Sequence, residues 1–239
     1  MTQDLTAARP LSFLQRVVGV LFSPGETMAA VAAHPRWADV LAFTTLLVAA
    51  GFAVFLSTDV GKLAYVDQAV ANIEAFGGTV TAETQPGIQA QAAIAAWLQG
   101  GAVLLFGPLM TALTAGILFG VFTVLGGEAT YKQVFAVVTH AGVISLLQQA
   151  FTLPVNYLRG TMSSATNLGV FFPDLAEGSF LAAVLGFVDL FWIWYLVVLA
   201  IGLGAVYRRR WTPVASGLLV AYVLIGLAVA AIKAALGGR

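Results

Sequence analysis

The stretch VLGFVDLFWIWYLVVLAIGLGAV, from Val184 to Val206, contains one charged side chain, Asp189. An α-helix rises about 1.5 Å per residue, so roughly 20 apolar residues cross the hydrocarbon core of a bilayer. The stretch is long enough and apolar enough to predict a transmembrane helix.

Four other stretches have the same length and character. Together they predict an all-α integral membrane protein with five transmembrane helices, at about 38–57, 101–125, 134–153, 184–206 and 214–236. Residues 1–37 then form short cytoplasmic or interfacial helices ahead of a transmembrane domain at 38–236, and residues 58–100 form a helical loop outside. An odd number of spans places the two termini on opposite sides of the membrane.

Composition supports this class and excludes several others. Of the 239 residues, 60% are hydrophobic and 9% are charged, whereas about a quarter of the residues in soluble domains are charged. The net charge is zero and no long basic cluster occurs, so no nucleic-acid partner is expected. With no cysteine and two histidines, the sequence predicts no metal, cofactor or catalytic residue.

Basic residues predict the orientation of the spans. Seven lie on one side of the predicted spans and four on the other. The first set is Arg9, Arg16, Arg36, Lys132, Arg208, Arg209 and Arg210, and the second is Lys62, Arg159, Lys233 and Arg239. The positive-inside rule therefore predicts a cytoplasmic N-terminus and an outer C-terminus, which corresponds to a multi-pass protein of a bacterial plasma membrane.

The segment FSPGETMAAVAAHPRW, from Phe22 to Trp37, precedes the first span. The apolar run before it, VVGVLF, is shorter than the core of a signal peptide, so a cleaved leader is not expected. Ser23, Pro24 and Glu26 have the spacing of a capping box with proline at the first helical position. These residues predict the start of a short helix that Pro35 ends.

An amphipathic helix is predicted immediately before Ser23. Its apolar residues share one face, with Gln15, Arg16 and Gly19 elsewhere; they are Phe13, Leu14, Val17, Val18, Leu21 and Phe22. Such a helix suits the headgroup layer of a membrane. We take Phe13, Val17, Leu21, Ser23, Pro24 and Glu26 as candidate partner or interfacial residues. The alternative is a frayed amphipathic tail without a partner.

Ionisable residues inside spans are costly and are candidates for function. His140 lies in the third predicted span and Asp189 near the start of the fourth. Their expected depths differ too much for a proton relay, whereas Gln148 and Gln149 are level with Asp189 and predict a carboxylate–amide contact. Asp189 either caps its helix or binds a substrate or ion. His140 is either a neutral residue bonded to a neighbouring helix or a proton carrier.

The segment GGEATYKQ, from Gly126 to Gln133, joins the second and third spans. Glu128 and Lys132 have the i, i+4 spacing of a helical ion pair, and the two glycines favour a tight reversal of the chain. The alternative is a turn that starts the third helix, with Thr130 or Glu128 near its cap.

The outer loop is predicted to contain helices. In GKLAYVDQAVANIEAF apolar residues recur at helical intervals, and Gly77 and Gly78 follow as a stop. After Pro86, the chain is predicted to run into the second span as one long helix.

Four passages carry a resemblance to a known family. They are RVVGVLFSPGETMAAVAAHPRW, GGEATYKQVFAVVTHAGVISLLQQ, LPVNYLRGTMSSATNLGVFFPD and LGFVDLFWIWYLVVLAIGLGAVYRR. In order and spacing they resemble a bacterial member of the Yip family, named for eukaryotic proteins that interact with Ypt/Rab GTPases. The resemblance implies five membrane helices and a cytoplasmic N-terminus. The Rab-linked role in vesicle traffic does not transfer to a bacterium.

The functional hypothesis is a non-enzymatic membrane protein that recruits or organises partners. Its expected partners are the lipid bilayer and membrane or cytoplasmic proteins, with a homo-oligomer left open. The alternative is a transporter or channel for small solutes or ions that uses polar groups around Asp189 and His140.

Overall fold

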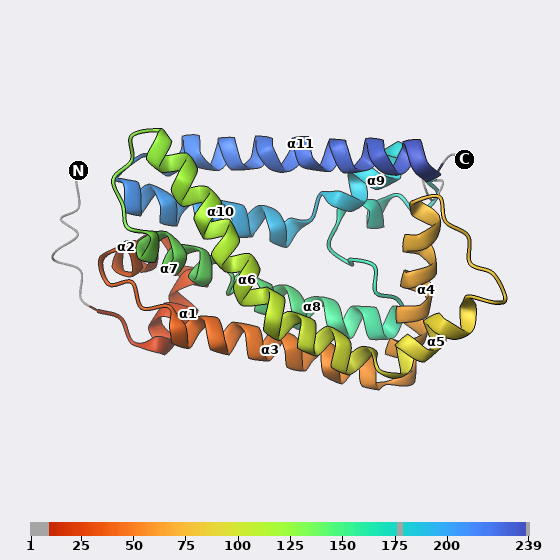
Figure 1. Ribbon diagram of the computed structural model, residues 1–239. Helices are drawn as coiled ribbons and strands as arrows, with labels where there is room; N and C mark the ends of the chain where they lie inside the picture. Colours follow the sequence, from red (N-terminus) through yellow and green to blue (C-terminus); the bar gives the residue numbers. More distant parts are fainter. Residues whose placement is uncertain (1–9, 176–178, 238–239) are drawn as a thin grey trace. The chain divides into compact units, whose positions relative to one another are not determined.

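The computed structural model describes residues 10–175 and 179–237 and consists of helices (Figure 1). Their bounds are α1 Phe13–Phe22, α2 Pro24–Ala33, α3 Ala38–Ser57, α4 Asp59–Ala75, α5 Gln85–Ala93, α6 Ala95–Val124, α7 Tyr131–Ala141, α8 Ile144–Arg159, the 3₁₀ helix η2 Leu168–Phe171, α9 Phe180–Phe187, α10 Leu190–Tyr207 and α11 Trp211–Gly237. The described residues form no strand beyond an isolated bridge between Asn167 and Asp189. The predicted all-α fold class is confirmed.

Within the described residues, five helical segments are long and apolar enough to cross a membrane. They are Ala38–Ser57, Ala95–Val124, Tyr131–Arg159, Leu190–Tyr207 and Trp211–Ala235. The number and order of the spans agree with the sequence prediction. The short helices α1 and α2 precede the first span, as predicted, and α4 forms in the loop between the first two spans, before Gly77, whose φ is +80°.

The predicted start of the fourth span was wrong. We expected a helix from residue 184, but α9 ends at Phe187 and α10 begins at Leu190. The helix is interrupted at Val188 and Asp189, where the Val188 carbonyl accepts from the N–H of Leu168 and the N–H of Leu190 donates to the Thr166 carbonyl. Asp189 therefore precedes the span and does not lie within it.

Two other boundaries also differ from the prediction. The third span begins at Tyr131, is interrupted at Gly142 and Val143, and continues through Pro154 to Arg159. The chain after Pro86 does not form one long helix: α5 ends at Ala93, and the N–H of Ile94 bonds to the carbonyl of Gln91 at 3.1 Å. The second span starts at Ala95, earlier than expected.

The contacts divide the chain into two compact units. Unit 1 contains Met1–Val48, Ala102–Leu147 and Ile193–Leu219, and unit 2 contains Ala49–Gly101, Gln148–Trp192 and Val220–Arg239. All connections predicted to be cytoplasmic belong to unit 1, and those predicted to be outside belong to unit 2.

Helix α7 is the central helix of unit 1, where every residue from Val134 to Ala141 is buried. Helices α1 and α2 lie against it (Figure 1). Gly202 lets α10 approach α7 and α2 closely, because an added Cβ there would overlap Val137 and meet Met28 Sδ at 3.1 Å. The N-terminal helices are thus packed into a core with two of the spans.

Unit 2 has its own small core between α3, α4 and α6. Phe55, Leu56, Ala64 and Ala95 are buried there. Gly61 allows α4 to pass close to the carbonyl of Phe55, which an added Cβ would overlap. Helix α4, in the loop between the first two spans, is therefore packed against α3.

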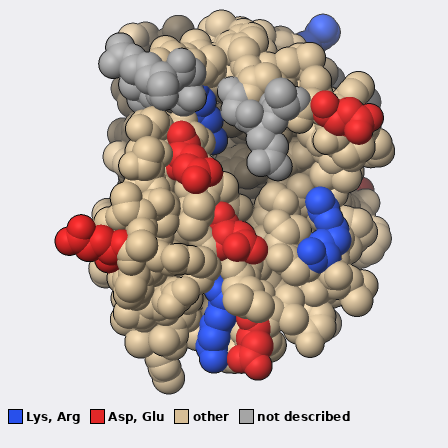
Figure 2. All heavy atoms as spheres, turned by 90° about the vertical axis from the view of Figure 1, so that its right-hand side faces the viewer, with Lys and Arg blue, Asp and Glu red and all other residues tan. Residues whose placement is uncertain are grey.

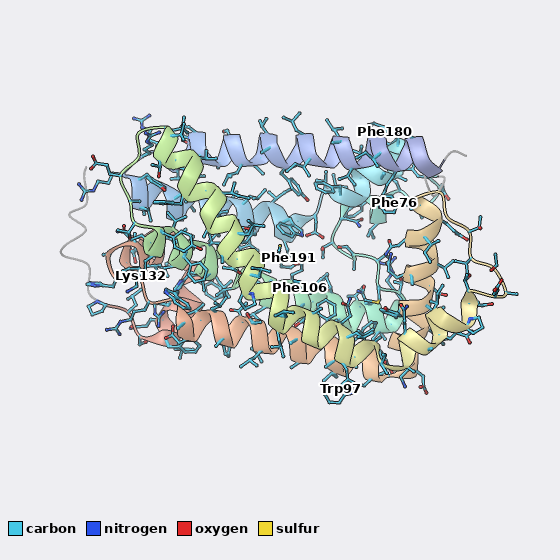
Figure 3. The ribbon with its side chains drawn as sticks, viewed as in Figure 1. Phe76, Trp97, Phe106, Lys132, Phe180 and Phe191 are labelled. Carbon is cyan, nitrogen blue, oxygen red and sulfur yellow. The ribbon has the colours of Figure 1, made fainter. Side chains whose placement is uncertain are left out.

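Large apolar side chains remain exposed along the spans. Trp97 is 84% exposed and points away from α6, and Phe106 on the same helix is half exposed (Figure 3). Further exposed residues follow on α6 and α11, including Leu105, Ile117, Val124, Val220, Leu224 and Ile225. Water-soluble monomers rarely expose so many large apolar side chains, whereas lipid covers them without cost.

Candidate functional site

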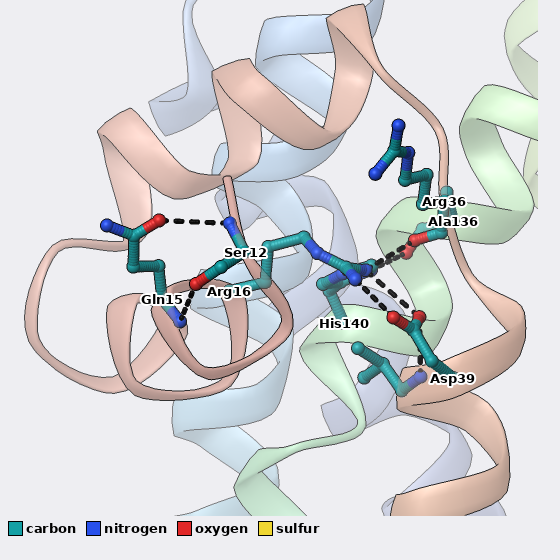
Figure 4. Close-up of polar contacts among 8 residues, drawn as sticks. Ser12, Gln15, Arg16, Arg36, Asp39, Ala136 and His140 are labelled. Atoms are coloured by element: carbon teal, nitrogen blue, oxygen red, sulfur yellow. Dashed lines mark hydrogen bonds and ion pairs between the residues drawn. The ribbon is translucent and has the colours of Figure 1, made fainter. Parts of the chain in front are cut away.

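Arg16 on α1 is the centre of a buried polar network in unit 1 (Figure 4). Its Nη1 donates to the carbonyl oxygen of Arg36 at 2.8 Å and to Asp39 Oδ1 at 3.1 Å, and its Nη2 forms an ion pair with Asp39 Oδ2. The Arg16 side chain is 5% exposed, whereas that of Asp39 is 47% exposed. The network fixes α1 to the junction where α2 ends and α3 begins.

His140 completes this network from α7. Its Nε2 lies 3.2 Å from Nη1 of Arg16, and its Nδ1 lies 2.7 Å from the carbonyl oxygen of Ala136. A guanidinium can only donate, so Nε2 accepts and Nδ1 carries the proton that is donated to Ala136. The hydrogen-bond partners therefore assign a neutral imidazole that is fully buried. This agrees with the reading of His140 as a residue bonded to a neighbouring helix.

Sequence analysis missed the roles of Arg16 and Asp39. Arg16 was placed away from the apolar face of its helix, yet its side chain points into the protein. The available signals were a single arginine in an otherwise uncharged helix and a single aspartate at the start of a span. Their pairing could not be read from sequence, because 23 residues separate them.

The capping box predicted at Ser23 and Glu26 does not form. Ser23 is the N-cap of α2 and Pro24 begins that helix, but the Ser23 side chain makes no capping bond. Ser23 also ends α1, where its N–H bonds to the carbonyl of Gly19, and its φ of −142° and ψ of 58° suit this tight junction. Glu26 is exposed.

A capping box does form at the start of α1. The N–H of Gln15 donates to Ser12 Oγ at 3.3 Å, and the N–H of Ser12 donates to Gln15 Oε1 at 2.9 Å (Figure 4). The start of the first helix is therefore well defined.

The predicted apolar face of α1 is divided between the protein and its surroundings. Phe13, Val17 and Leu21 are half-buried, and the ring of Phe13 packs edge-on to Phe43 with centroids 5.2 Å apart. The exposed residues are Leu14 at 66%, Val18 at 44% and Phe22 at 80%. These three, named here the α1 ridge, are the more exposed candidate contact residues, and the roles of Phe13, Val17 and Leu21 stay a prediction.

Asp189 forms a second polar cluster, in unit 2. The hydroxyls of Ser164 and Thr166 donate to Asp189 Oδ2 at 2.7 Å and 2.6 Å. Its Oδ1 accepts from the N–H groups of Phe191 at 2.9 Å and Trp192 at 3.3 Å, and Gln148 Nε2 lies 3.4 Å away. Asp189 is 4% exposed, and its carboxylate caps the N-terminus of α10.

Of the two glutamines predicted to lie level with Asp189, one makes the expected contact. Gln148 makes the carboxylate–amide contact predicted with Asp189. Gln149 lies against α3, where an added Cβ at Gly51 would be 2.5 Å from its Oε1.

Tyr222 on α11 bridges the break between α9 and α10. Its hydroxyl accepts from the N–H of Asp189 at 3.3 Å and donates to the carbonyl of Phe187. The N–H of Leu168 bonds to the Val188 carbonyl at 3.0 Å, and the N–H of Leu190 to the Thr166 carbonyl at 3.1 Å. The backbone groups freed by the break thus find hydrogen-bond partners inside the protein, as buried backbone groups require.

Sequence reasoning did not identify Ser164, Thr166 or Tyr222 as partners of Asp189. The one available signal was Tyr222, whose hydroxyl stands alone in an apolar stretch of the fifth span. The loop hydroxyls gave no signal.

The ion pair predicted between Glu128 and Lys132 does not form among the described residues. Helix α7 begins only at Tyr131, so Glu128 is outside it. Thr130 is the N-cap and forms a capping box with Gln133, which also donates from Nε2 to the carbonyl of Ala32 at 3.0 Å. The segment therefore forms the alternative, a turn that starts the third helix. Gly126 reverses the chain in this turn with a φ of +75°.

Over residues 10–175 and 179–237, no group of three or more His, Asp or Glu side chains is arranged to hold a metal ion. Arg16 and His140 make bonds that fasten helices, and Asp189 caps one.

These features define an all-α, multi-pass membrane protein. The sequence model described as the Yip1 domain matches residues 18–232, and the chain belongs to this family. The resemblance found in the sequence is thereby confirmed. Comparison with curated proteins and comparison with solved structures each give no match.

Proposed function

We propose that this Yip1 domain protein is a non-enzymatic membrane protein that recruits or organises partner proteins through its N-terminal hairpin, α1 and α2. The observation that carries the proposal is the buried Arg16 network, which holds the hairpin against α3 and α7 while the α1 ridge stays exposed. A surface that is already ordered loses little conformational entropy when a partner binds it. The Yip1 family is not known as a family of enzymes.

The distribution of charge supports a cytoplasmic position for this hairpin. Among the described residues, unit 1 has six basic and three acidic side chains, and unit 2 has three basic and six acidic ones. The basic residues of unit 1 are Arg16, Arg36, Lys132, Arg208, Arg209 and Arg210; Arg9 and Arg239 lie outside the described residues. Figure 2 views the face that carries α4 and α5, where both acidic and basic side chains lie at separate points. By the positive-inside rule, this distribution supports a cytoplasmic position for unit 1 in a bacterial cell.

The test replaces the α1 ridge without touching its buried side. In the variant Leu14→Ser, Val18→Ser, Phe22→Ser, the Arg16 network keeps all its partners, so the five spans should insert normally. Crosslinking in intact cells, followed by purification and mass spectrometry, should then recover fewer partner proteins than the unaltered chain. A matched control is Leu63→Ser with Ile73→Ser, two exposed apolar residues of α4 in unit 2.

The recruitment proposal would be contradicted if the ridge variant recovers every partner of the unaltered chain. Strong quenching of a fluorophore at position 22 by a nitroxide lipid would then identify the ridge as a lipid contact. Homo-oligomerisation stays a prediction. The molecular mass of the purified protein in detergent tests it.

The transporter alternative receives little support from the contacts of its two candidate residues. Both oxygens of Asp189 accept hydrogen bonds, and both ring nitrogens of His140 have partners. These bonds suit residues that hold helices in place. Flux of ions or solutes into liposomes that is lost in Asp189→Asn, with the fold intact, would favour transport instead.

A further inference from the structure

The turn between α10 and α11 brings three arginines to the boundary of the membrane. One span ends at Tyr207 and the next begins at Trp211, so Arg208, Arg209 and Arg210 form the entire connection. Three residues reach at most about 10 Å when extended, so their Cα atoms cannot leave the headgroup layer. All three side chains are exposed.

The backbone of this turn is built to hold the arginines in one arrangement. The N–H of Arg209 bonds to the carbonyl of Gly204 at 3.0 Å, which is the C-terminal closure of a Schellman motif. Gly204 permits it, since an added Cβ would lie 3.0 Å from the Arg209 carbonyl oxygen and 3.1 Å from Trp211 Cα. Arg209 also donates from Nη2 to the carbonyl of Leu125, 2.8 Å away, and so ties the turn to the end of α6.

Arg208 occupies a conformation that favours glycine. Its φ of 53° lies in the left-handed region, and no other described residue except glycine has a positive φ. Glycine adopts this region without a steric penalty and is the usual residue at this position of a Schellman motif. Arginine is less stable than glycine in this conformation but adds a positive charge, which indicates that the charge has a role.

Apolar surface adjoins the charged turn. At the end of α6, Val124 is 88% exposed and Leu125 is 58% exposed, and the carbonyl of Leu125 is the group that Arg209 contacts. A cationic group at headgroup level beside exposed aliphatic side chains matches the two ends of a phospholipid, a phosphate and an acyl chain.

We propose that Arg208 and Arg210 bind the phosphate of an anionic phospholipid, whose acyl chain lies against Val124 and Leu125. Guanidinium groups bind phosphate oxygens through two parallel hydrogen bonds, and Arg209 positions the turn through its bond to Leu125. The position of the turn at the headgroup layer favours a lipid over an acidic protein. The proposal is independent of partner recruitment by α1 and of which leaflet contains the turn.

The experiment measures lipid binding by the full-length protein in a neutral detergent. Short-chain phosphatidylglycerol is titrated, and phosphatidylcholine with the same acyl chains serves as the reference. Phosphatidylglycerol should bind more tightly, and added salt should weaken it because the exposed charges are screened. Replacing each arginine should weaken phosphatidylglycerol binding by about fivefold, as expected for a basic residue at an anionic surface.

The variant Arg208→Gly, Arg210→Gln separates charge from folding. Glycine at 208 relieves the strained backbone, so the variant should unfold at the same temperature as the unaltered protein or higher while its lipid affinity falls. The matched control Arg159→Gln, Lys233→Gln removes two basic residues of unit 2 and should retain the affinity.

Four results would overturn the proposal. They are equal affinity for the two lipids, undiminished affinity in the arginine variant, an equal loss in the unit 2 control, and full competition by inorganic phosphate, which would identify a free anion as the ligand. If the second of these results is accompanied by loss of a crosslinked protein from the arginine variant, the arginines are assigned to an acidic protein partner instead.

Discussion

The guanidinium of Arg16 and the carboxylate of Asp39 form an ion pair across 23 residues of sequence, and this pair attaches α1 to the start of α3. Arg16 also donates to the neutral imidazole of His140 on α7. One side chain therefore contacts an N-terminal helix junction and two predicted spans. The hairpin that we propose as a recruitment surface depends on it.

Replacing Arg16 with methionine should loosen the N-terminal hairpin. The change leaves Asp39, His140 and the Arg36 carbonyl without their shared donor. Breaking a fully buried ion pair costs about 3–5 kcal/mol, and because half of the Asp39 side chain is exposed we expect about 2 kcal/mol here. Thermal unfolding in detergent measures this loss, and chymotrypsin should cleave at Phe22 or Trp37 sooner.

The matched control for this prediction is Arg36→Gln. The exposed Arg36 side chain is altered while its carbonyl, the group that Arg16 contacts, remains. Equal stability and equal cleavage in Arg16→Met and Arg36→Gln would show that the buried network does not hold the hairpin.

Asp189→Ala should destabilise the break between α9 and α10. The substitution removes the acceptor of two hydroxyls and of the first N–H groups of α10. Loss of an N-cap costs about 1 kcal/mol, and each buried donor left without a partner adds about 1 kcal/mol or more. Asp189→Asn should lose less, because an amide oxygen still accepts from Phe191. Calorimetry in detergent should give the highest unfolding temperature for the unaltered protein, a lower one for Asp189→Asn and the lowest for Asp189→Ala.

Tyr222→Phe tests the same break from the other side. Without the hydroxyl, the N–H of Asp189 and the carbonyl of Phe187 lose a partner in apolar surroundings, at a cost of about 1–3 kcal/mol. Hydrogen exchange of the peptide containing residues 187–190 should accelerate. Unchanged exchange there, together with unchanged stability, would mean that Tyr222 does not support the break.

Thr130→Ala and Glu128→Gln distinguish the two interpretations of the turn before α7. The first removes the hydroxyl that caps α7 and should cost about 1 kcal/mol. The second changes an exposed charge with no ion-pair partner among the described residues, so its effect should stay within about 0.5 kcal/mol. An effect of Glu128→Gln as large as that of Thr130→Ala would restore the predicted pair with Lys132.

The five spans could be predicted because hydropathy and helical periodicity are local properties of the sequence. The polar clusters could not, since their members are distant in sequence: Ser164 is 25 residues and Tyr222 is 33 residues from Asp189. The capping error at Ser23 has a related cause. The motif was recognised correctly as a helix start, but it could not reveal that α1 ends on the same serine and determines its backbone angles.

The absence of cysteine from the sequence makes a direct test of orientation possible. Single cysteines at Glu26 and Lys132 in unit 1, and at Asp67 and Glu74 in unit 2, occupy predominantly exposed, charged positions of the two units. The charge distribution predicts that a membrane-impermeant maleimide labels positions 67 and 74 in intact cells, and positions 26 and 132 only after permeabilisation. Labelling of positions 26 and 74 from the same side would contradict the proposed orientation, and with it the cytoplasmic location of the hairpin.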